Sequence, residues 1–237
     1  MRLNIDLGEL PDEDAELYRQ AHLACVACGG HAGDDASMRR AVGLCLRHGT
    51  ELGAHPSYPD REGFGRRPMA MAAADLRASV REQCARLAGV ARALGATIRF
   101  VKAHGALYHA SREDPAVATA LLEGTLDALG PEVAFVGPAA GALAEAVASS
   151  GLALSREGFA DRGVRADGTL VPRGEPGAMI LEPAVAAARA VAIAASGEAD
   201  TVCVHGDSPG AVAIAKAVRA ALDGWRASPV DARRKDA

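Results

Sequence analysis

Short apolar segments alternate with longer helical patterns along most of the chain. Leu3, Ile5 and Leu7 alternate with polar neighbours, which is the two-residue period of a β-strand. Residues 97–102 gather β-branched and aromatic side chains, which favour strands. Together these patterns predict eight strands, at residues 2–7, 23–27, 51–54, 97–102, 132–136, 152–154, 178–181 and 201–204.

Between the strands, apolar positions recur at helical spacing, and several of these segments end at glycine. Acidic side chains at the start of residues 34–48 favour a helix N-terminus, and Gly49 follows as the expected C-cap. We predict helices at residues 34–48, 75–94, 114–129, 139–149, 183–195 and 209–222. Strands that alternate with helices indicate crossover units and a parallel sheet. Seven or eight such units in one α/β chain favour a closed (β/α) barrel over an open sheet.

We expect one barrel domain at residues 1–225, since 237 residues fit a single α/β barrel. Residues 226–237 form a charged tail that we expect to fray. Residues 157–177 are rich in Gly, Arg and Asp, and we interpret them as a large functional loop.

Composition narrows the class of protein. With 49% hydrophobic and 24% charged residues the chain can bury a core, so a disordered chain is excluded. A net charge of −4 and an aromatic content of 3% provide neither the basic surface nor the stacking platforms of nucleic-acid-binding proteins. No apolar run approaches the roughly 20 residues that span a bilayer, so we expect no membrane segment.

The cysteines indicate the compartment. Five are present, and an odd number favours reduced thiols in a cytoplasm over a disulfide framework. Asp6 and Glu9 interrupt the N-terminal apolar stretch, so we expect no signal peptide and a cytoplasmic protein. Cys25 and Cys28 have C-x-x-C spacing, but no second pair follows for a zinc ribbon. We interpret both as small buried thiols, with a reactive Cys28 thiol as the alternative.

Polar side chains follow the predicted strands at the end where a barrel carries its active site. Four of the seven histidines come directly after strands, and acidic or basic residues accompany them. The set comprises Asn4, Asp6, Glu9, His31, His55, Lys102, His104, His205 and Asp207. A single histidine here is more often a hydrogen-bonded structural group, but the repetition favours a functional ring. Histidines with carboxylates suit general acid–base chemistry.

The same residues could hold a divalent metal ion, with Asp6, His55 and His104 as its ligands. Histidine and aspartate form zinc and other transition-metal sites, often with one position left open for water. No helix supplies two ligands at HxxxH or HxxE spacing, so this interpretation depends on convergence in space.

Two loops carry further candidates. Residues 55–67 are dense in Pro, Gly and charge but contain Tyr58 and Phe64, which is typical of a surface that covers a substrate or docks a partner. A solvated connection is the alternative. In the second loop, the planar guanidinium groups of Arg162 and Arg173 suit a carboxylate or a phosphate. Neither G-x-x-x-x-G-K-[ST] nor G-x-G-x-x-G follows a strand, so a standard nucleotide-binding loop is missing.

Seven stretches, in order, carry a family pattern that extends over about residues 2–224. They are NIDLGE (4–9), ACGGHAGD (27–34), GAHPSYPDREGFGR (53–66), KAHGALY (102–108), FADRG (159–163), DGTLVPR (167–173) and VCVHGD (202–207). These stretches resemble the LamB/YcsF family. The resemblance implies a barrel related to the glycoside hydrolase/deacetylase superfamily. It also implies the A subunit of a bacterial 5-oxoprolinase, which opens 5-oxo-L-proline to L-glutamate with ATP hydrolysis, in a complex with B and C subunits.

For that reaction we assign Asp6 and either His55 or His104 to acid–base chemistry, and Lys102 and His205 to stabilising negative charge. The candidate substrate-binding residues are Asn4, Glu9, His31, Arg162, Arg173 and Asp207. ATP is the expected co-substrate, with Mg²⁺, and partner subunits could bind it. The alternatives are a stand-alone metal-dependent hydrolase or deacetylase and a non-catalytic subunit that binds 5-oxoproline. A bound transition metal and a homo-oligomer both stay open.

Overall fold

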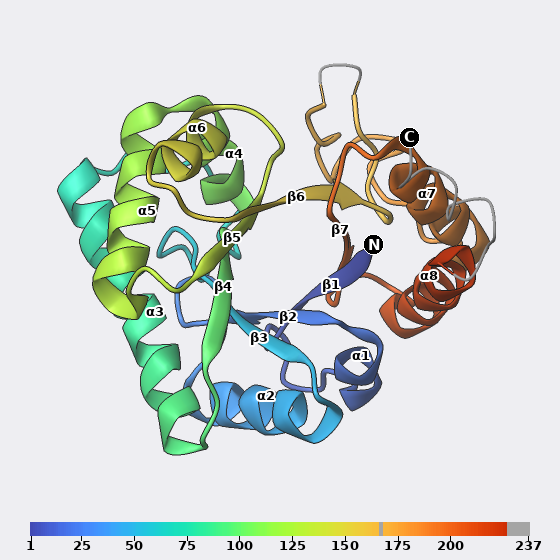
Figure 1. The fold of residues 1–237 in the computed structure, drawn as a ribbon, viewed down its shortest axis with the longest axis horizontal. Helices are drawn as coiled ribbons and strands as arrows, with labels where there is room; N and C mark the ends of the chain where they lie inside the picture. The colour runs from blue at the N-terminus through green and yellow to red at the C-terminus, as the bar shows by residue number, and fades with distance from the viewer. Residues whose placement is uncertain (166–167, 227–237) are drawn as a thin grey trace.

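Seven parallel strands close into a barrel in the computed structural model, which describes residues 1–165 and 168–226 (Figure 1). Each strand pairs with the next along the chain, and β7 returns to pair with β1. The strands are β1 (Arg2–Leu7), β2 (Leu23–Ala27), β3 (Glu51–His55), β4 (Ile98–Lys102), β5 (Ala134–Gly137), β6 (Leu154–Phe159) and β7 (Thr201–His205). The prediction of a closed (β/α) barrel is confirmed, with seven strands.

Helices connect the strands and cover the outside of the barrel (Figure 1). They are α1 (Ala15–Gln20), α2 (Asp35–His48), α3 (Ala73–Ala93), α4 (Gly105–Glu113), α5 (Pro115–Leu129), α6 (Ala142–Ser149), α7 (Pro183–Ser196) and α8 (Ala211–Arg226). The sequence sets several of their ends. Asp34 caps α2 by accepting a hydrogen bond from the Ser37 N–H, and Gly49 ends that helix in the left-handed conformation. Pro115 and Pro183 stand at the first positions of α5 and α7, where no N–H is needed.

The strand predicted at residues 178–181 is wrong. This apolar run returns along the loop after β6, where Met179 makes only an isolated antiparallel bridge with Arg162. The Ile180 N–H donates to the Asp161 carbonyl at 2.9 Å and holds the run against the other arm of the same loop. The apolar residues therefore pack within a loop.

The sixth strand, β6, begins where the predicted strand 152–154 ends. Its sequence LSREGF has no β-branched residue, which explains the misplaced boundary. Arg156 pairs with Asp200 on the outside, whereas Glu157 pairs with Lys102 inside the barrel. The first three residues of the predicted functional loop therefore belong to a strand.

Two short helices were not predicted, and the tail is only partly described. The helix α1 has six residues, and α4 begins at Gly105, directly after β4, where a loop was expected. The helix α8 extends to Arg226, and the rest of the predicted tail lies outside the described residues.

The barrel has an apolar layer on each side of its strands. Outward-facing residues such as Leu3, Ile5 and Leu7 pack under the helices. Inside, a small group made of Leu23, Cys25, Phe100 and Val136 fills the barrel. The Phe100 ring occupies the space beside Gly53, where an added Cβ would lie 2.2 Å from it. Polar side chains lie nearer the C-terminal ends of the strands, where barrels of this kind carry their active sites.

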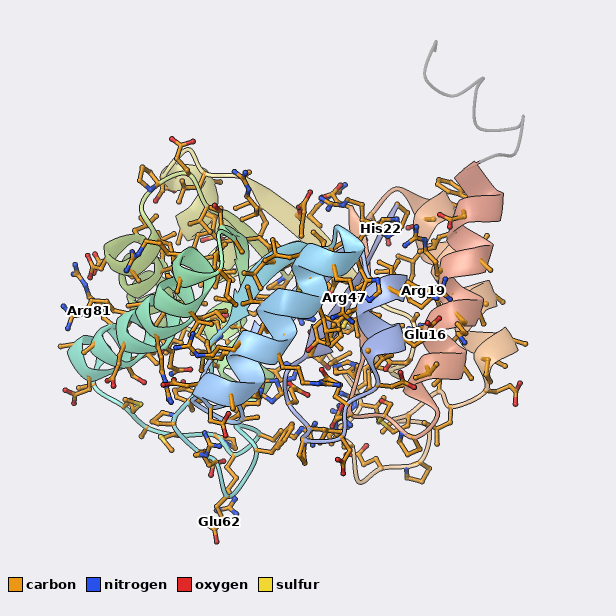
Figure 2. All side chains as sticks on the ribbon, turned by 90° about the horizontal axis from the view of Figure 1, so that it is seen from below. Glu16, Arg19, His22, Arg47, Glu62 and Arg81 are labelled. Carbon is orange, nitrogen blue, oxygen red and sulfur yellow. The ribbon has the colours of Figure 1, made fainter. Side chains whose placement is uncertain are left out.

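The outer surface is charged and the thiols lie inside. Glu16 and Arg19 form an ion pair on α1, and Glu62 projects from the segment after β3 (Figure 2). All five cysteines are buried and free, and burial raises the pKa of Cys28 to about 12. Within the described residues, no helix is both long and apolar enough to cross a membrane.

Candidate active site

A buried lysine at the end of β4 organises the first group of polar side chains. The Lys102 ammonium donates to Asn4 Oδ1 at 3.1 Å, Asp6 Oδ1 at 2.8 Å and Cys203 Sγ at 3.1 Å. Glu157 Oε1 also lies 2.8 Å from Nζ, but it accepts no hydrogen bond with acceptable angles. An ammonium has three N–H groups, and all three donate to other acceptors, so none is left for Glu157. We call these five residues the ammonium cluster.

Electrostatics keep this cluster ionised. Burial alone would lower the pKa of Lys102, but the surrounding groups, Asp6 first, hold it well above its ordinary value. Burial alone would raise the pKa of Asp6, but His55 and Lys102 hold it well below its ordinary value. Burial and the charge of Glu157 hold the pKa of Tyr108 well above its usual range. The ion pair is therefore fixed in the charged form.

A second group, the imidazole cluster, consists of Glu9, His31, His55 and His104. Gly8 turns the chain after β1 at a φ of 72°, and Glu13 accepts its N–H at 2.9 Å, which places Glu9 over the end of the barrel. Glu9 Oε1 lies 2.9 Å from His31 Nε2, 3.2 Å from His104 Nδ1 and 3.8 Å from His55 Nε2. All four residues are buried.

Backbone carbonyls fix which nitrogens of two histidines carry hydrogen. His55 Nδ1 lies 2.7 Å from the Lys102 carbonyl, and His104 Nε2 lies 2.9 Å from the Phe64 carbonyl. A carbonyl only accepts, so each of these nitrogens must donate. The other nitrogens, His55 Nε2 and His104 Nδ1, are 3.0 Å apart. In the neutral rings, two lone pairs therefore face each other, with the Glu9 carboxylate beside them.

Burial favours the neutral forms of His31 and His104. Burial, and then the charge of His104, lower the pKa of His31 to about 3. Burial also lowers the pKa of His104, although Glu9 opposes the shift. Burial alone would raise the pKa of Glu9, but the neighbouring His104 and His31 rings hold it well below the ordinary value. Glu9 is thus an anion among imidazoles, and no described lysine or arginine pairs with it.

The loop after β3 closes over the imidazole cluster. His31 and His104 stack with ring centroids 3.6 Å apart and planes 3° from parallel, and Phe64 meets both rings edge-on. Gly65 has a φ of 65°, and a Cβ there would lie 2.8 Å from His31 Cβ and 3.0 Å from His104 Cδ2. The Gly65 carbonyl also accepts the Ala106 N–H at 2.9 Å, so the loop is tied to α4.

A third group lies at the end of β7. His205 Nδ1 donates to Asp161 at 2.9 Å, and the Asp161 carboxylate also accepts the His205 N–H at 2.8 Å. His205 Nε2 lies 3.8 Å from Asp6 Oδ2, which is itself 3.4 Å from His55 Nε2. Burial alone would lower the pKa of His205, but Asp161 raises it overall. This histidine therefore holds its proton more strongly than an exposed one.

These groups face a cavity of about 620 Å³. Asp6, His55, Lys102, His104 and His205 are among its lining residues, with Phe159 and Tyr108. Four arginines line it as well: Arg66, Arg162, Arg165 and Arg173. The volume lies within the range of small-molecule sites.

The arginines are held by few carboxylates. Asp207 pairs with Arg66 and also with Arg173, the latter at 3.2 Å. Arg162 donates to the Ala178 carbonyl at 3.0 Å and to the Val171 carbonyl at 2.7 Å, so it also joins the two arms of its loop. Burial, and then the charge of Arg173, lower the pKa of Arg162. The cavity wall is thus suited to an anionic ligand.

The structure brings every residue of the predicted set into one connected region. Some of these residues line the cavity, and the others lie behind them. Seven line the cavity: Asp6, His55, Lys102, His104, His205, Arg162 and Arg173. The other four, Asn4, Glu9, His31 and Asp207, contact or pair with these from behind.

Sequence analysis missed several contributors. Glu157 was missed because β6 was misplaced, and His109 lines the cavity from α4, which was not predicted. Asp161, Tyr108 and Arg66 lie within the family stretches, and only this membership indicated that they belong to the site. No spacing rule pointed to them individually.

Potential metal ligands fall into two groups in the part of the chain that the structure describes. One contains Glu9, His31, His55 and His104, and the other contains Asp6, Cys203 and His205. Asp6 falls in the second group, although its Oδ2 lies 3.4 Å from Nε2 of His55, with which it was combined as a possible ligand. Asp6 Oδ1 already accepts from Lys102, whose positive charge opposes a metal ion there.

Comparison with known proteins places this geometry in context. The model of the LamB/YcsF family matches residues 1–235. A protein of Methylococcus capsulatus, named as the A subunit of 5-oxoprolinase, is 44% identical, covering 94% of this chain and 96% of its own. A Chloroflexus aggregans protein of the same name is 42% identical, covering 93% and 94%.

Solved structures agree on the fold. The crystal structure of a lactam utilization protein from Thermus thermophilus superposes with a TM-score of 0.87 at 34% identity, over 94% of this chain and 96% of that one. A family 4 carbohydrate esterase from Streptomyces lividans superposes with a TM-score of 0.51 at 12% identity, over 94% and 88%, and supports the barrel fold alone.

Proposed function

The chain belongs to the LamB/YcsF family, and on that premise we propose that it is the A subunit of an ATP-dependent 5-oxoprolinase. Its substrate would be 5-oxo-L-proline, whose lactam ring is opened to L-glutamate. The observation that carries the proposal is the convergence of the family stretches on one cavity, which is lined by Asp6, Lys102, four histidines and an arginine wall.

The arginine wall fits the substrate carboxylate. Arg162 and Arg173 offer planar N–H donors that match a carboxylate in two-point contact. Asp207 holds Arg173 from behind and so presents its guanidinium to the cavity. The ring amide would then lie toward the strand ends, beside Asp6 and His205.

Ring opening adds water across the C–N amide bond. The water oxygen becomes part of the new carboxylate, and the ring nitrogen leaves as an amine after gaining a proton. Asp6 is ionised and is positioned to accept a proton from the attacking water. His55 and His104 are the other candidate acceptors, because in a neutral ring the nitrogen that does not face a backbone carbonyl can take a proton.

Positive charge is provided where negative charge develops. The Lys102 ammonium lies next to Asp6 at the end of β4. His205, whose proton Asp161 stabilises, lies on the opposite side of Asp6 and can donate to the leaving nitrogen. Both groups are fixed before substrate arrives, which is how an oxyanion is stabilised most effectively.

In this proposal, partner subunits bind the ATP that the reaction uses. The chain has neither of the two standard glycine-rich phosphate loops, and an unactivated lactam is a poor electrophile. Phosphorylation of the amide oxygen by ATP would activate the ring for attack. Departure of the ring nitrogen would then leave an acyl phosphate, and its hydrolysis by a second water would give the glutamate carboxylate and release phosphate. The B and C subunits expected for the family would bind ATP with Mg²⁺ and supply this activation.

The test is ATP-dependent release of glutamate from 5-oxoproline by the chain reconstituted with its partner subunits. Asp6→Asn should lower turnover by about 10²–10⁴-fold, which is the contribution of a positioned acid–base group. Arg77→Ala, an exposed site on α3, is the matched control and should retain activity. Normal turnover by Asp6→Asn would remove the assignment, and no turnover by the wild-type complex would remove the proposed function.

A further inference from the structure

The imidazole cluster is short of positive charge. Its central oxygen, Glu9 Oε1, and two imidazole nitrogens, His55 Nε2 and His104 Nδ1, are mutually separated by 3.0, 3.2 and 3.8 Å. In a neutral ring each of these nitrogens presents a lone pair, because the other nitrogen of the ring donates to a carbonyl. Three electron-pair donors therefore converge on a space that contains no hydrogen when the rings are neutral.

We propose that Glu9, His55 and His104 bind a divalent transition-metal ion of the zinc type. Two imidazoles and one glutamate form a known set of ligands for catalytic zinc, which keeps its fourth position open. With metal–ligand distances of 2.0–2.2 Å, tetrahedral ligands lie about 3.4 Å apart. The observed separations of 3.0–3.8 Å bracket that value.

The surroundings of the three residues support the same conclusion. Histidines that bind metals almost always donate their second N–H to a carbonyl or carboxylate, which fixes the ring. The Lys102 and Phe64 carbonyls have this role at 2.7 and 2.9 Å. His55 and His104 line the cavity, so the open position would face the substrate.

His31 is excluded as a fourth ligand and becomes a positioning residue. An imidazole lone pair lies in the plane of its ring, and the His31 and His104 planes are 3° from parallel with centroids 3.6 Å apart. One ion cannot lie in both planes. His31 Nε2–H instead donates to Glu9 Oε1 at 2.9 Å and orients that carboxylate.

The site differs from the ammonium cluster, the other location with potential ligands. Asp6 there has an ammonium 2.8 Å away, whereas no described lysine or arginine pairs with Glu9. The ion would also supply Lewis-acid chemistry next to Asp6. The inference relies on the proposed function for that role only, because the site itself is argued from geometry.

The experiment uses the isolated full-length chain, stripped of metal by a chelator and then titrated with Zn²⁺ or Co²⁺. Elemental analysis after gel filtration should find one ion per chain. Tetrahedral Co²⁺ should give visible absorption. Glu9→Gln and His104→Gln should abolish stoichiometric binding, while circular dichroism confirms that each variant is folded. His31→Gln should weaken binding by about 10–100-fold, as expected for a residue that orients a ligand.

His205→Gln is the matched control because it removes a histidine from the other potential site, and it should bind Co²⁺ as the wild type does. Absence of stoichiometric binding by the wild type would overturn the inference, and so would binding that survives Glu9→Gln but is lost in His205→Gln. A complex that releases glutamate with a metal-free chain would overturn the role of the ion in the reaction and leave the proposed function intact. A chain that binds one ion but releases no glutamate with its partners would support this site and remove the proposed function.

Discussion

Two buried polar clusters lie side by side at the end of one barrel, but their charges are balanced differently. In the ammonium cluster, every N–H of Lys102 has an acceptor and two carboxylates surround the cation. In the imidazole cluster, Glu9 is surrounded by imidazole rings, and His55 Nε2 and His104 Nδ1 lie 3.0 Å apart. The first cluster contains its own cation, whereas no described lysine or arginine pairs with the carboxylate of the second. Burial by itself therefore does not distinguish a structural ion pair from a ligand site.

Removal of the Lys102 ammonium should have the largest effect on stability, and it tests the difference between the two clusters directly. Lys102→Met leaves Asp6 and Glu157 buried without their ammonium, which should lower the free energy of unfolding by about 3–5 kcal/mol. Urea denaturation measures the change. Lys216→Met, at an exposed lysine that pairs with Glu16 at 3.5 Å, is the control and should change stability by less than about 0.5 kcal/mol. Equal losses of unfolding free energy in the two variants would show that Lys102 does not stabilise the buried carboxylates.

The next largest effect concerns the histidine that borders the ammonium cluster. Asp161→Asn should lower the pKa of His205 and cost about 1.5–3 kcal/mol, because a buried charged hydrogen bond is lost. The pKa of His205 is raised in the folded protein, so its stabilising effect is present at acidic pH and is lost as pH rises through that pKa. The pKa of Asp161 is lowered, so its effect is lost as pH falls.

The difference in unfolding free energy between wild type and Asp161→Asn should therefore be greatest between the ordinary pKa values of Asp and His, about 3.9 and 6.5. Denaturation at a series of pH values, with NMR titration of the His205 ring, tests this window. A difference that stays constant from pH 4 to pH 9 would show that the two groups are not linked.

A third prediction concerns the loop that covers the imidazole cluster. Gly65→Ala should cost about 1–3 kcal/mol more than Gly49→Ala, since overpacking a tight site carries this penalty. Both glycines have a φ between 65° and 68°, but only Gly65 has His31 and His104 within 3.0 Å of an added Cβ. The comparison therefore isolates contact from backbone strain, and equal losses would show that the loop is not packed on the histidines.

The smallest effect should come from the imidazole cluster without metal. Glu9→Gln in metal-free protein should change the unfolding free energy by about 1 kcal/mol, because His31 exchanges a carboxylate acceptor for an amide. Added Zn²⁺ should then stabilise the wild type but not the variant, as expected for a ligand that binds only the folded state. Thermal unfolding with and without Zn²⁺ measures both. If Glu9→Gln lowered the unfolding free energy as much as Lys102→Met does, the two clusters would not differ in how their carboxylates are stabilised.

Much of the fold could be predicted from local patterns. The alternation of Leu3, Ile5 and Leu7 and the β-branched run at residues 97–102 identify strands that the structure confirms. β6 could not be located in the same way, because Arg156 and Glu157 are charged and have partners far away in the chain. Only the closed barrel shows that Glu157 lies inside against Lys102.

The candidate site was predictable as a set of residues but not as a set of contacts. Their positions after strands indicated that His55, His104 and Asp6 would approach one another. The backbone carbonyls of Lys102 and Phe64 decide which nitrogen of His55 and of His104 donates a hydrogen bond. A pattern of residue types does not show where backbone carbonyls point. The metal ligands proposed from sequence and from structure differ for this reason, with Glu9 in place of Asp6.

Closure of the barrel between β1 and β7 also sets the timing of assembly. Asp6 is in register with His205, almost 200 residues later in the chain. A nascent chain on the ribosome holds β1 and β6 as unpaired edges until Thr201–His205 emerges. Contacts so distant in sequence form slowly, so the barrel closes late. A chain that ends before β7 therefore has neither the closed sheet nor the histidine in register with Asp6.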